Sequence, residues 1–418
     1  MIGYRRSERM MNQTLRKLVF AMAAAAWLTS PAQAQVPCRY EVTHIIQGPY
    51  SQTLGYPLTA GTSISPSGRY VCGYYNYFID NRAFVYDTQT RQFTTIPVPP
   101  STFTFANDVN EQYVVGQGEG QGFLYRISTG QLTILPPGVP PDIGTCSVNA
   151  INSRNVVCGT RTITGAPDFK TSAFIWTPQD GFTDLGLING QSTSASDIND
   201  GNAVAGTMIV SNTQHPFLWK AREFIDAGSL AGIGSTVPLS VNNSSQIVGY
   251  GGVPMDGAPP WGVNRPFVWS GGSFTQLSIL PAHLHGFAQD SNNAGLIVGH
   301  SRPQTGPDHA VLWWNGQLRE LNELIDNESS FAVAAYEILE DGRILASGYN
   351  GNTISALILA PSNPPFGDIN SDCRVNVNDL LRVINDWGQV TSPADLDRDG
   401  LVGLSDLVIV VTHWAPFP

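Results

Sequence analysis

Charged residues are scarce in this chain, and several patterns that would assign a function directly are missing. Asp, Glu, Lys and Arg supply 13% of the 418 residues, about half the share in an ordinary globular protein. The net charge is -11 and no basic stripe occurs, which argues against a nucleic-acid partner. No GxSxG, HExxH, phosphate-binding glycine loop or CxxC pair is present. The common signals of catalysis and of zinc binding are therefore absent.

Long apolar runs are missing too, except for one short run near the N-terminus. Residues 18–28 follow Arg16 and Lys17 and precede Ala32-Gln33-Ala34. The run is too short to span a bilayer, and this order of charge, apolar run and small-x-small site is typical of a secretion signal. We predict a signal peptide over residues 1–34, cleaved after Ala34. The mature protein is then secreted or held at the cell surface by a partner, and it is not an integral membrane protein.

Glycine and proline, by contrast, are abundant, with 42 and 29 residues, which indicates many turns between short strands. One phrase recurs seven times: an apolar residue, usually Asn, a short turn, two or three apolar residues, and an anchor residue. The anchors are Gly73, Gly116, Gly159, Gly206, Gly249, Gly299 and Ala346. A second phrase with an aromatic end follows six of the anchors, as in Ala83-Phe84-Val85-Tyr86.

These units predict an all-β fold, a seven-bladed β-propeller over residues 38–360. Each unit holds about four short strands at a period in the forties, which is typical of a propeller blade. The seventh unit lacks its fourth strand, and a strand-like segment at residues 40–45 precedes the first unit. We predict that this segment completes the last blade and removes an open sheet edge. The repeated aromatics are interpreted as core, the Asn residues as turn caps, and the Gly residues as points of close strand approach.

The second phrase resembles the signature of the HAF-type extracellular repeats. Arg82-Ala83-Phe84 and His309-Ala310 come closest, and His215-Pro216-Phe217 is a variant. The resemblance covers residues 40–360. It implies a secreted β-repeat protein and says little about activity.

The five cysteines leave at least one thiol unpaired. They are Cys38, Cys72, Cys146, Cys158 and Cys373. Cys72 and Cys158 occupy a slot that holds small apolar residues in other units, so both are interpreted as buried thiols. A turn at residues 152–155 would place Cys146 opposite Arg161, out of register with Cys158. The disulfide pairing among the first four cysteines stays open.

After a Pro-rich linker at residues 361–366, the chain repeats itself with an offset of 27 residues. Two loops, at residues 368–379 and 395–406, carry oxygen ligands at positions 1, 3, 5, 7 and 12, the spacing of a calcium loop before a helix. Loop one adds Asn376 at position 9, where loop two has Gly403 and water must substitute. The predicted ligands are Asp368, Asn370, Asp372, Arg374 (carbonyl), Asn376 and Asp379 in loop one, and Asp395, Asp397, Asp399, Leu401 (carbonyl) and Asp406 in loop two. The sequence thus predicts two Ca²⁺ sites, with Cys373 as a strained substitute for glycine at position 6 of loop one.

Tandem loops with Asp at position 12 and no entering helix resemble the EF-hand-like loops of type I dockerin modules, over residues 367–415. The resemblance implies a small α-helical domain that binds a cohesin-like domain, often in a polysaccharide-degrading assembly. It also implies recognition positions at Val377, Asn378, Leu404 and Ser405. Loop two has one more carboxylate and keeps Gly400 at its turn, so we expect it to bind Ca²⁺ more tightly.

Two functions from different classes follow. The first is a non-catalytic propeller that binds protein or glycan and is tethered through the dockerin-like module. The alternative is a polysaccharide-acting hydrolase or lyase with its site in the central funnel, which needs facing carboxylates. The acidic candidates are Asp290, Asp308 and Glu337. The loops after the anchors are the expected ligand-binding face, and Trp261 in one of them could either stack on a sugar ring or pack its own loop. His283, His285, His300 and His309 lie in neighbouring segments and could form a metal cluster, or they could be solvated or bonded within turns.

Overall fold

The structure is a computed structural model, and it describes most of the chain after residue 36. The described ranges are 37–49, 58–77, 80–99, 103–135, 144–163, 170–229, 234–253, 262–325, 330–351, 353–362, 365–370, 373 and 375–414. The predicted signal peptide, Trp261, Asp372 and Arg374 lie outside these residues.

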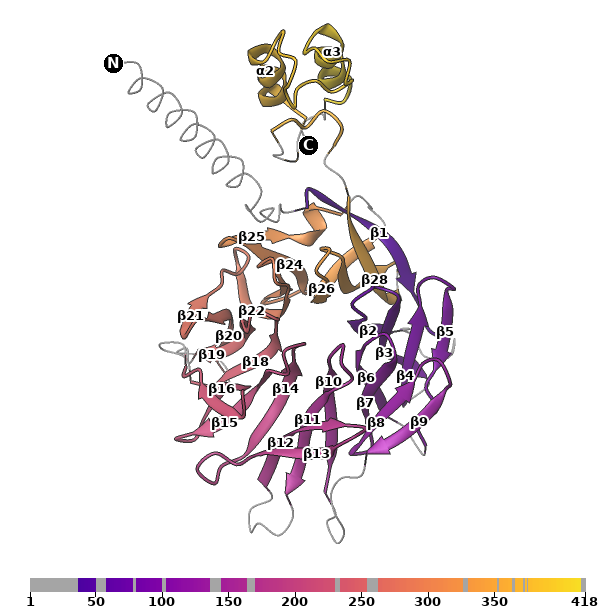
Figure 1. Cartoon of the computed structure of the whole chain (residues 1–418), viewed down its shortest axis with the longest axis vertical. Coiled ribbons are helices and arrows are strands. Elements are labelled where there is room, and N and C mark those ends of the chain that lie inside the picture. The colour runs from indigo at the N-terminus through magenta and orange to yellow at the C-terminus, as the bar shows by residue number, and fades with distance from the viewer. Residues whose placement is uncertain are drawn as a thin grey trace, which may run out of the picture. The chain divides into compact units, whose positions relative to one another are not determined.

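Seven antiparallel sheets of four strands each follow one another around a ring (Figure 1). Blades one to three are β2 (Thr59–Ile64), β3 (Tyr70–Tyr77), β4 (Asp80–Asp87), β5 (Gln92–Thr95); β6 (Thr104–Val109), β7 (Tyr113–Gly118), β8 (Gln121–Arg126), β9 (Gln131–Leu135); and β10 (Cys146–Ile151), β11 (Val157–Ile163), β12 (Lys170–Thr177), β13 (Gly181–Gly186). Blades four and five are β14 (Thr193–Ile198), β15 (Val204–Val210), β16 (Thr213–Lys220), β17 (Glu223–Asp226); and β18 (Thr236–Val241), β19 (Ile247–Val253), β20 (Val263–Ser270), β21 (Ser273–Gln276). Blades six and seven are β22 (His283–Ser291), β23 (Ile297–Pro303), β24 (His309–Trp314), β25 (Gln317–Glu320); and β26 (Ser330–Ile338), β27 (Ile344–Asn350), β28 (Thr353–Ser362), β1 (Arg39–Ile46). The predicted seven blades of four strands are confirmed.

Blade seven is closed by the N-terminal strand, as the sequence predicts. β1 pairs antiparallel with β28, from Arg39 opposite Ser362 to Ile46 opposite Ala356. The order β26-β27-β28-β1 therefore takes three strands from the end of the repeat and one from its beginning. β28 continues through Ser362, so the propeller strand extends into the first two residues of the predicted linker.

The blade cores hold the repeated aromatic residues, which confirms their predicted structural role. The second residue of the phrase is fully buried as Phe84, Phe123, Phe174, Phe217 and Phe267. The aromatic end is buried as Tyr125, Trp269 and Trp313 and half-buried as Tyr86, Trp176 and Trp219. The anchor glycines allow the first two strands of a blade to approach closely. A Cβ atom on Gly116 would lie 2.0 Å from the carbonyl oxygen of Phe105, so no larger residue fits without shifting a strand.

The repeated Asn residues cap turns, as predicted, and they also join neighbouring blades. The Asn110 Oδ1 atom accepts the N–H groups of Gln112 and Tyr113, both at 2.8 Å. Its Nδ2 group donates to the carbonyl of Asn152 in the next blade, at 2.8 Å. The same link continues from blade to blade through Asn152, Asn199, Asn242 and Asn292 to the carbonyl of Leu339. Each buried side-chain amide thus accepts N–H groups in its own turn and donates to a carbonyl group in the turn of the next blade.

The cysteines confirm part of the sequence prediction and add one disulfide that it missed. Cys146 lies opposite Arg161, and Cys72, Cys146 and Cys158 are buried free thiols. Cys38, one residue before β1, forms a disulfide with Cys373. The sequence had assigned Cys373 only to a turn of loop one.

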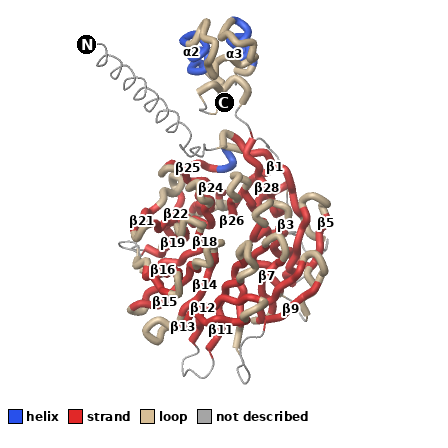
Figure 2. Tube along the Cα trace, in the orientation of Figure 1, coloured by secondary structure: helices blue, strands red, loops and turns tan. Residues whose placement is uncertain are grey.

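Helices are confined, among the described residues, to three short segments (Figure 2). One is the 3₁₀ helix Leu321–Glu323 beside blade six. The others are α2 (Val377–Asn385) and α3 (Leu404–Thr412), which pack around a small core. That core contains Val375, Val383, Ala394, Val402 and Val410. None of the described helices is long and apolar enough to cross a membrane.

Candidate functional site

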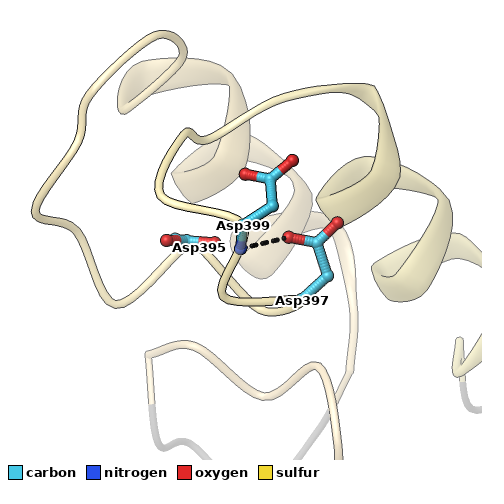
Figure 3. Close-up of side chains that lie close together, drawn as sticks. All are labelled: Asp395, Asp397 and Asp399. Carbon is cyan, nitrogen blue, oxygen red and sulfur yellow. Dashed lines mark hydrogen bonds between the residues drawn. The ribbon is translucent and has the colours of Figure 1, made fainter.

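Loop two brings together three of its predicted metal ligands. One carboxylate oxygen from each of Asp395, Asp397 and Asp399 lies within 4.8 Å of the others, and all three side chains come from one tight loop (Figure 3). Asp397 accepts the N–H group of Asp399 at 3.0 Å, and Asp395 accepts that of Gly400 at 3.1 Å. The Asp395 Oδ1 atom is buried and has no hydrogen-bond partner. A buried carboxylate oxygen without a donor fits a cation ligand.

Asp406, the predicted position-12 ligand, does not join this group of three. It is fully buried at the start of α3. Its carboxylate accepts N–H groups from Leu396 at 2.6 Å, Asp397 at 3.2 Å and Gly403 at 2.8 Å. Burial raises the pKa of Asp406, but these N–H groups outweigh it and hold the pKa below its usual value. The group is therefore kept ionised and ties both ends of the loop to the helix. Leu401, whose carbonyl is the predicted position-7 ligand, has an exposed side chain.

Loop one repeats this arrangement in the residues that the structure describes. Asp379 is fully buried at the start of α2. It accepts the N–H groups of Ile369 at 2.8 Å, Asn370 at 3.2 Å and Asn376 at 2.9 Å. Asn376 caps α2 through the N–H group of Asn378. These contacts match those of loop two at the offset of 27 residues, so the internal duplication seen in the sequence is also structural.

The turn at position 6 is left-handed in both loops, with Gly400 in loop two and Cys373 in loop one. Gly400 has a φ of 93° and Cys373 has a φ of 72°. Both values lie in the left-handed region, which glycine adopts freely and cysteine does not. The Cys373 N–H group donates to Asp368 at 2.8 Å. The strained residue therefore positions the first predicted ligand of loop one.

The four positions implied for partner recognition all lie on the surface. Val377 and Leu404, the first residues of the two helices, are 51% and 68% exposed. Asn378 and Ser405 beside them are also exposed. Further exposed apolar residues follow along the helices at four- and three-residue steps: Leu381 and Ile384 on α2, and Val408 and Val411 on α3. Each helix thus presents an apolar stripe that begins at a predicted recognition position.

A second candidate site lies in the centre of the ring, in a cavity of about 340 Å³. The first strand of every blade contains a β-bulge that lines it. The bulged residues are Thr62, Asn107, Asn149, Ser196, Leu239, Gln289 and Tyr336. Turn residues such as Asp200 and Glu340, between the first and second strands, also contribute. The cavity therefore lies in the central funnel, where the sequence had placed the alternative enzyme site. Its described lining residues do not come from the loops after the anchors, where ligand binding was also expected.

Six carboxylates line the cavity, and no Lys, Arg or His joins them among the described residues. Four of the six, from Asp108, Asp197, Asp290 and Glu337, lie on the first strands, one residue after the bulge. Each accepts the N–H group of a residue in another blade. The acceptor–donor pairs are Asp108 with Ile151, Asp197 with Val241, Asp290 with Ile338, and Glu337 with Ile64. These bonds are 2.6 to 2.9 Å long. The sequence singled out Asp290 and Glu337 only as acidic candidates. All four occupy the same position in their repeat units, one residue after the bulge of the first strand, and this shared position was the signal in the sequence that could have linked them.

Burial raises the pKa values of these four carboxylates. Burial, reinforced by repulsion from Asp290, raises the pKa of Asp108 to about 6. Burial, with repulsion from Asp108 and Asp290, raises the pKa of Asp197 to about 7. Burial also raises the pKa values of Asp290 and Glu337. A carboxyl group whose pKa is higher in the folded chain than in the unfolded chain stabilises the fold at pH values below its unfolded pKa. This stabilisation is lost as pH rises through its folded pKa.

This linkage predicts that the propeller loses stability between pH 5 and pH 8. His300 acts in the opposite direction, because burial lowers its pKa to about 4 and its stabilisation is lost as pH falls below about 6.5. Asp197→Asn should reduce the loss of unfolding free energy between these pH values by roughly 2 kcal/mol. Urea unfolding at pH 5 and at pH 8 measures this change in unfolding free energy, and Asp180→Asn, at an exposed position, is the control. An unchanged pH slope in Asp197→Asn would contradict the assignment.

The four histidines that were considered as an alternative metal cluster do not form a metal group among the described residues. His300 stacks on Phe287, with ring centroids 4.5 Å apart. His309 lies 2.7 Å from Glu320, and its ring meets that of His283 edge-on. Asp308, the third acidic candidate, forms an ion pair with Arg302 at 2.8 Å. His300, His309 and Asp308 thus each make structural contacts with neighbouring side chains.

No protein-family model matches the sequence, and no curated protein matches it. Solved structures do resemble the fold. An oligogalacturonate lyase from Vibrio parahaemolyticus aligns over 73% of this chain and 90% of its own, with 8% identity and a TM-score of 0.50. The β-propeller domain of the trilobed protease from Pyrococcus furiosus aligns over 63% and 80%, with 14% identity and a TM-score of 0.44. An acylaminoacyl peptidase from Pyrococcus horikoshii aligns over 69% and 50%, with 12% identity and a TM-score of 0.45. At these identities the likeness concerns the fold alone.

Proposed function

We propose that this protein is a secreted, non-catalytic propeller that is tethered to a protein partner through a calcium-dependent, dockerin-like C-terminal module. The observation that carries the proposal is the loop geometry. Three carboxylates converge in loop two, and one of their oxygens is buried without a donor. Like charges held this close repel one another unless a cation is bound between them.

The ligand set fits calcium better than other common cations. Calcium takes about six to eight oxygen ligands from carboxylates, carbonyls and water. Asp395, Asp397, Asp399 and Asp406 and the Leu401 carbonyl would hold it in loop two. Asp368, Asn370, Asn376 and Asp379, with the predicted ligands Asp372 and Arg374, would do so in loop one. Bound Ca²⁺ would neutralise the clustered charge and fix each loop in front of its helix.

The partner surface is the pair of apolar stripes that begin at Val377 and Leu404. They are repeated on α2 and α3 at the internal offset of 27 residues, and their exposed side chains would be covered by a second protein. A cohesin-like domain is the partner that the dockerin resemblance implies. Because each stripe begins within a calcium loop, at position 10, loss of the ion would disorder the start of the helix and with it the surface.

Calcium-dependent partner binding tests the proposal. Isothermal titration of residues 35–418 with Ca²⁺ should show two sites, and an excess of chelator should abolish binding to a cohesin-like domain. Val377→Asp with Leu404→Asp should weaken partner binding at least tenfold without changing calcium stoichiometry, because neither side chain is a ligand. Exposed Asn212→Asp in blade four is the control. Partner binding that persists in chelator, or a chain without a calcium signal, would contradict the proposal.

One observation favours the alternative, a polysaccharide-acting enzyme with its site in the central cavity. A carboxyl group with its pKa near neutrality, as for Asp197, suits a general acid. Against it, both oxygens of Asp197 already accept backbone N–H groups, which suits a structural group. Hydrolysis of polysaccharides by the wild-type chain that Asp197→Asn abolishes would favour the enzyme.

A further inference from the structure

The disulfide between Cys38 and Cys373 joins two parts of the molecule that the sequence treats separately. Cys38 stands directly before β1, the strand that closes the ring. Cys373 stands at the strained turn of loop one. Through this bond, the closing strand and the calcium loop share one covalent connection besides the chain itself.

The propeller end of this connection is firmly held. Cys38 is 4% exposed, and the next residues enter β1. Arg39 pairs opposite Ser362, the last residue of β28. Tyr40 is fully buried, and its N–H group donates to the carbonyl of Leu324 at 2.8 Å. The chain leaves the propeller at Ser362 and is bonded back, at Cys373, to the residue beside that exit.

The loop end of the connection reaches the predicted metal ligands directly. The Cys373 N–H group binds the Asp368 carboxylate at 2.8 Å, and the Cys38 Sγ atom lies 4.0 Å from the same carboxylate. In loop two the corresponding residue, Gly400, reaches its left-handed conformation without a cross-link. The disulfide therefore holds Cys373, a residue of loop one whose conformation is unfavourable for its side chain and whose N–H group positions the first ligand.

We propose that the disulfide couples calcium binding in loop one to closure of the propeller by β1. This inference rests on the proposed calcium function. A closed propeller holds Cys38, and so presets Cys373 and Asp368 for the ion. Calcium in turn orders the loop and holds Cys38 and β1 in place. The coupling is reciprocal, because two events that share one conformational constraint must favour each other equally.

Hydrogen exchange of the β1 amides in the mature, oxidised chain tests the coupling. Calcium should slow the exchange of residues 39–46 about tenfold. In Cys38→Ser, which leaves every ligand in place, this protection should be lost although titration still detects bound calcium. Wild type treated with reductant should behave in the same way. Equal calcium protection of β1 in wild type and Cys38→Ser would overturn the coupling.

A second variant keeps the disulfide and removes the ion from loop one only. Asp379→Ala should leave calcium in loop two and abolish the calcium protection of β1. Protection that persists in Asp379→Ala would also overturn the coupling. A wild-type chain that shows no calcium signal would overturn the proposed function together with the coupling, whereas calcium binding without protection of β1 would overturn the coupling alone.

Discussion

Deletion of residues 38–48 is expected to destroy the propeller as a soluble fold. The deletion removes β1 and leaves β28 as an open edge with unpaired N–H and C=O groups, a template for aggregation. It also removes the buried side chains of Tyr40 and Ile46 and the disulfide partner of Cys373. We expect the variant in the insoluble fraction. A soluble deletion variant with an unchanged melting temperature would show that β1 does not close the ring.

Point variants separate packing by β1 from the effect of losing a strand. Ile46 is 1% exposed and lies in the core cluster that contains Ile64 of blade one and Ile358 of blade seven. Ile46→Ala should lower the unfolding free energy by about 2–5 kcal/mol. Its neighbour Ile45 is 40% exposed, so Ile45→Ala should change it by less than about 1 kcal/mol. Urea unfolding compares the two; equal losses would contradict the role of Ile46 between the blades.

The closure could be predicted from the sequence because it follows from counting strands. Seven units with one missing strand, and one spare strand before them, leave a single arrangement without an open edge. The anchor glycines and capping Asn residues were predictable for a similar reason, since each acts within its own turn or strand pair. The second hydrogen bond of each Asn, to the next blade, depends on blade packing and has no local signal.

Neither the disulfide nor the ring of carboxylates was predicted from the sequence, and the reasons are related. Cys38 and Cys373 are 335 residues apart, and their proximity follows only from ring closure. Asp108, Asp197, Asp290 and Glu337 occupy one slot in four units, whereas Ser63, Ala150 and Ser240 fill it in the others. Because this position holds an acid, a hydroxyl or a methyl group in different units, the sequence alone does not indicate a site there. The carboxylates come together only because the blades surround a common axis.

The calcium ligands were predictable because they follow one another along the chain. Sequence reasoning nevertheless assigned Asp379 and Asp406 to the ion alone. The structure gives each of them three backbone N–H groups as well. Replacement of either by Ala therefore removes a predicted ligand and three part-buried hydrogen bonds, each worth about 1.5–3 kcal/mol when the acceptor is charged. Both substitutions are expected to abolish calcium binding in their own loop and to unfold the start of their own helix.

Asp406→Ala is expected to cost more calcium affinity than Asp379→Ala. Loop two carries carboxylates at positions 1, 3, 5 and 12, whereas loop one has neutral Asn370 at position 3. The disulfide at Cys373 adds no charge to loop one, so the additional carboxylate of Asp397 decides the order. Calcium titration of residues 35–418 should lose its tighter site in Asp406→Ala and its weaker site in Asp379→Ala.

Each variant has a neighbour that serves as its control. Ser405 and Asn378 are exposed, stand one residue before the buried aspartates, and hold no predicted ligand atom. Ser405→Ala and Asn378→Ala should therefore keep both calcium sites. Helix content measured by circular dichroism should rise with calcium in these controls and rise less in the aspartate variants. Equal affinity losses in Asp406→Ala and Asp379→Ala would show that loop charge does not set the order. A helix content that calcium does not change would show that the helices form without the ion.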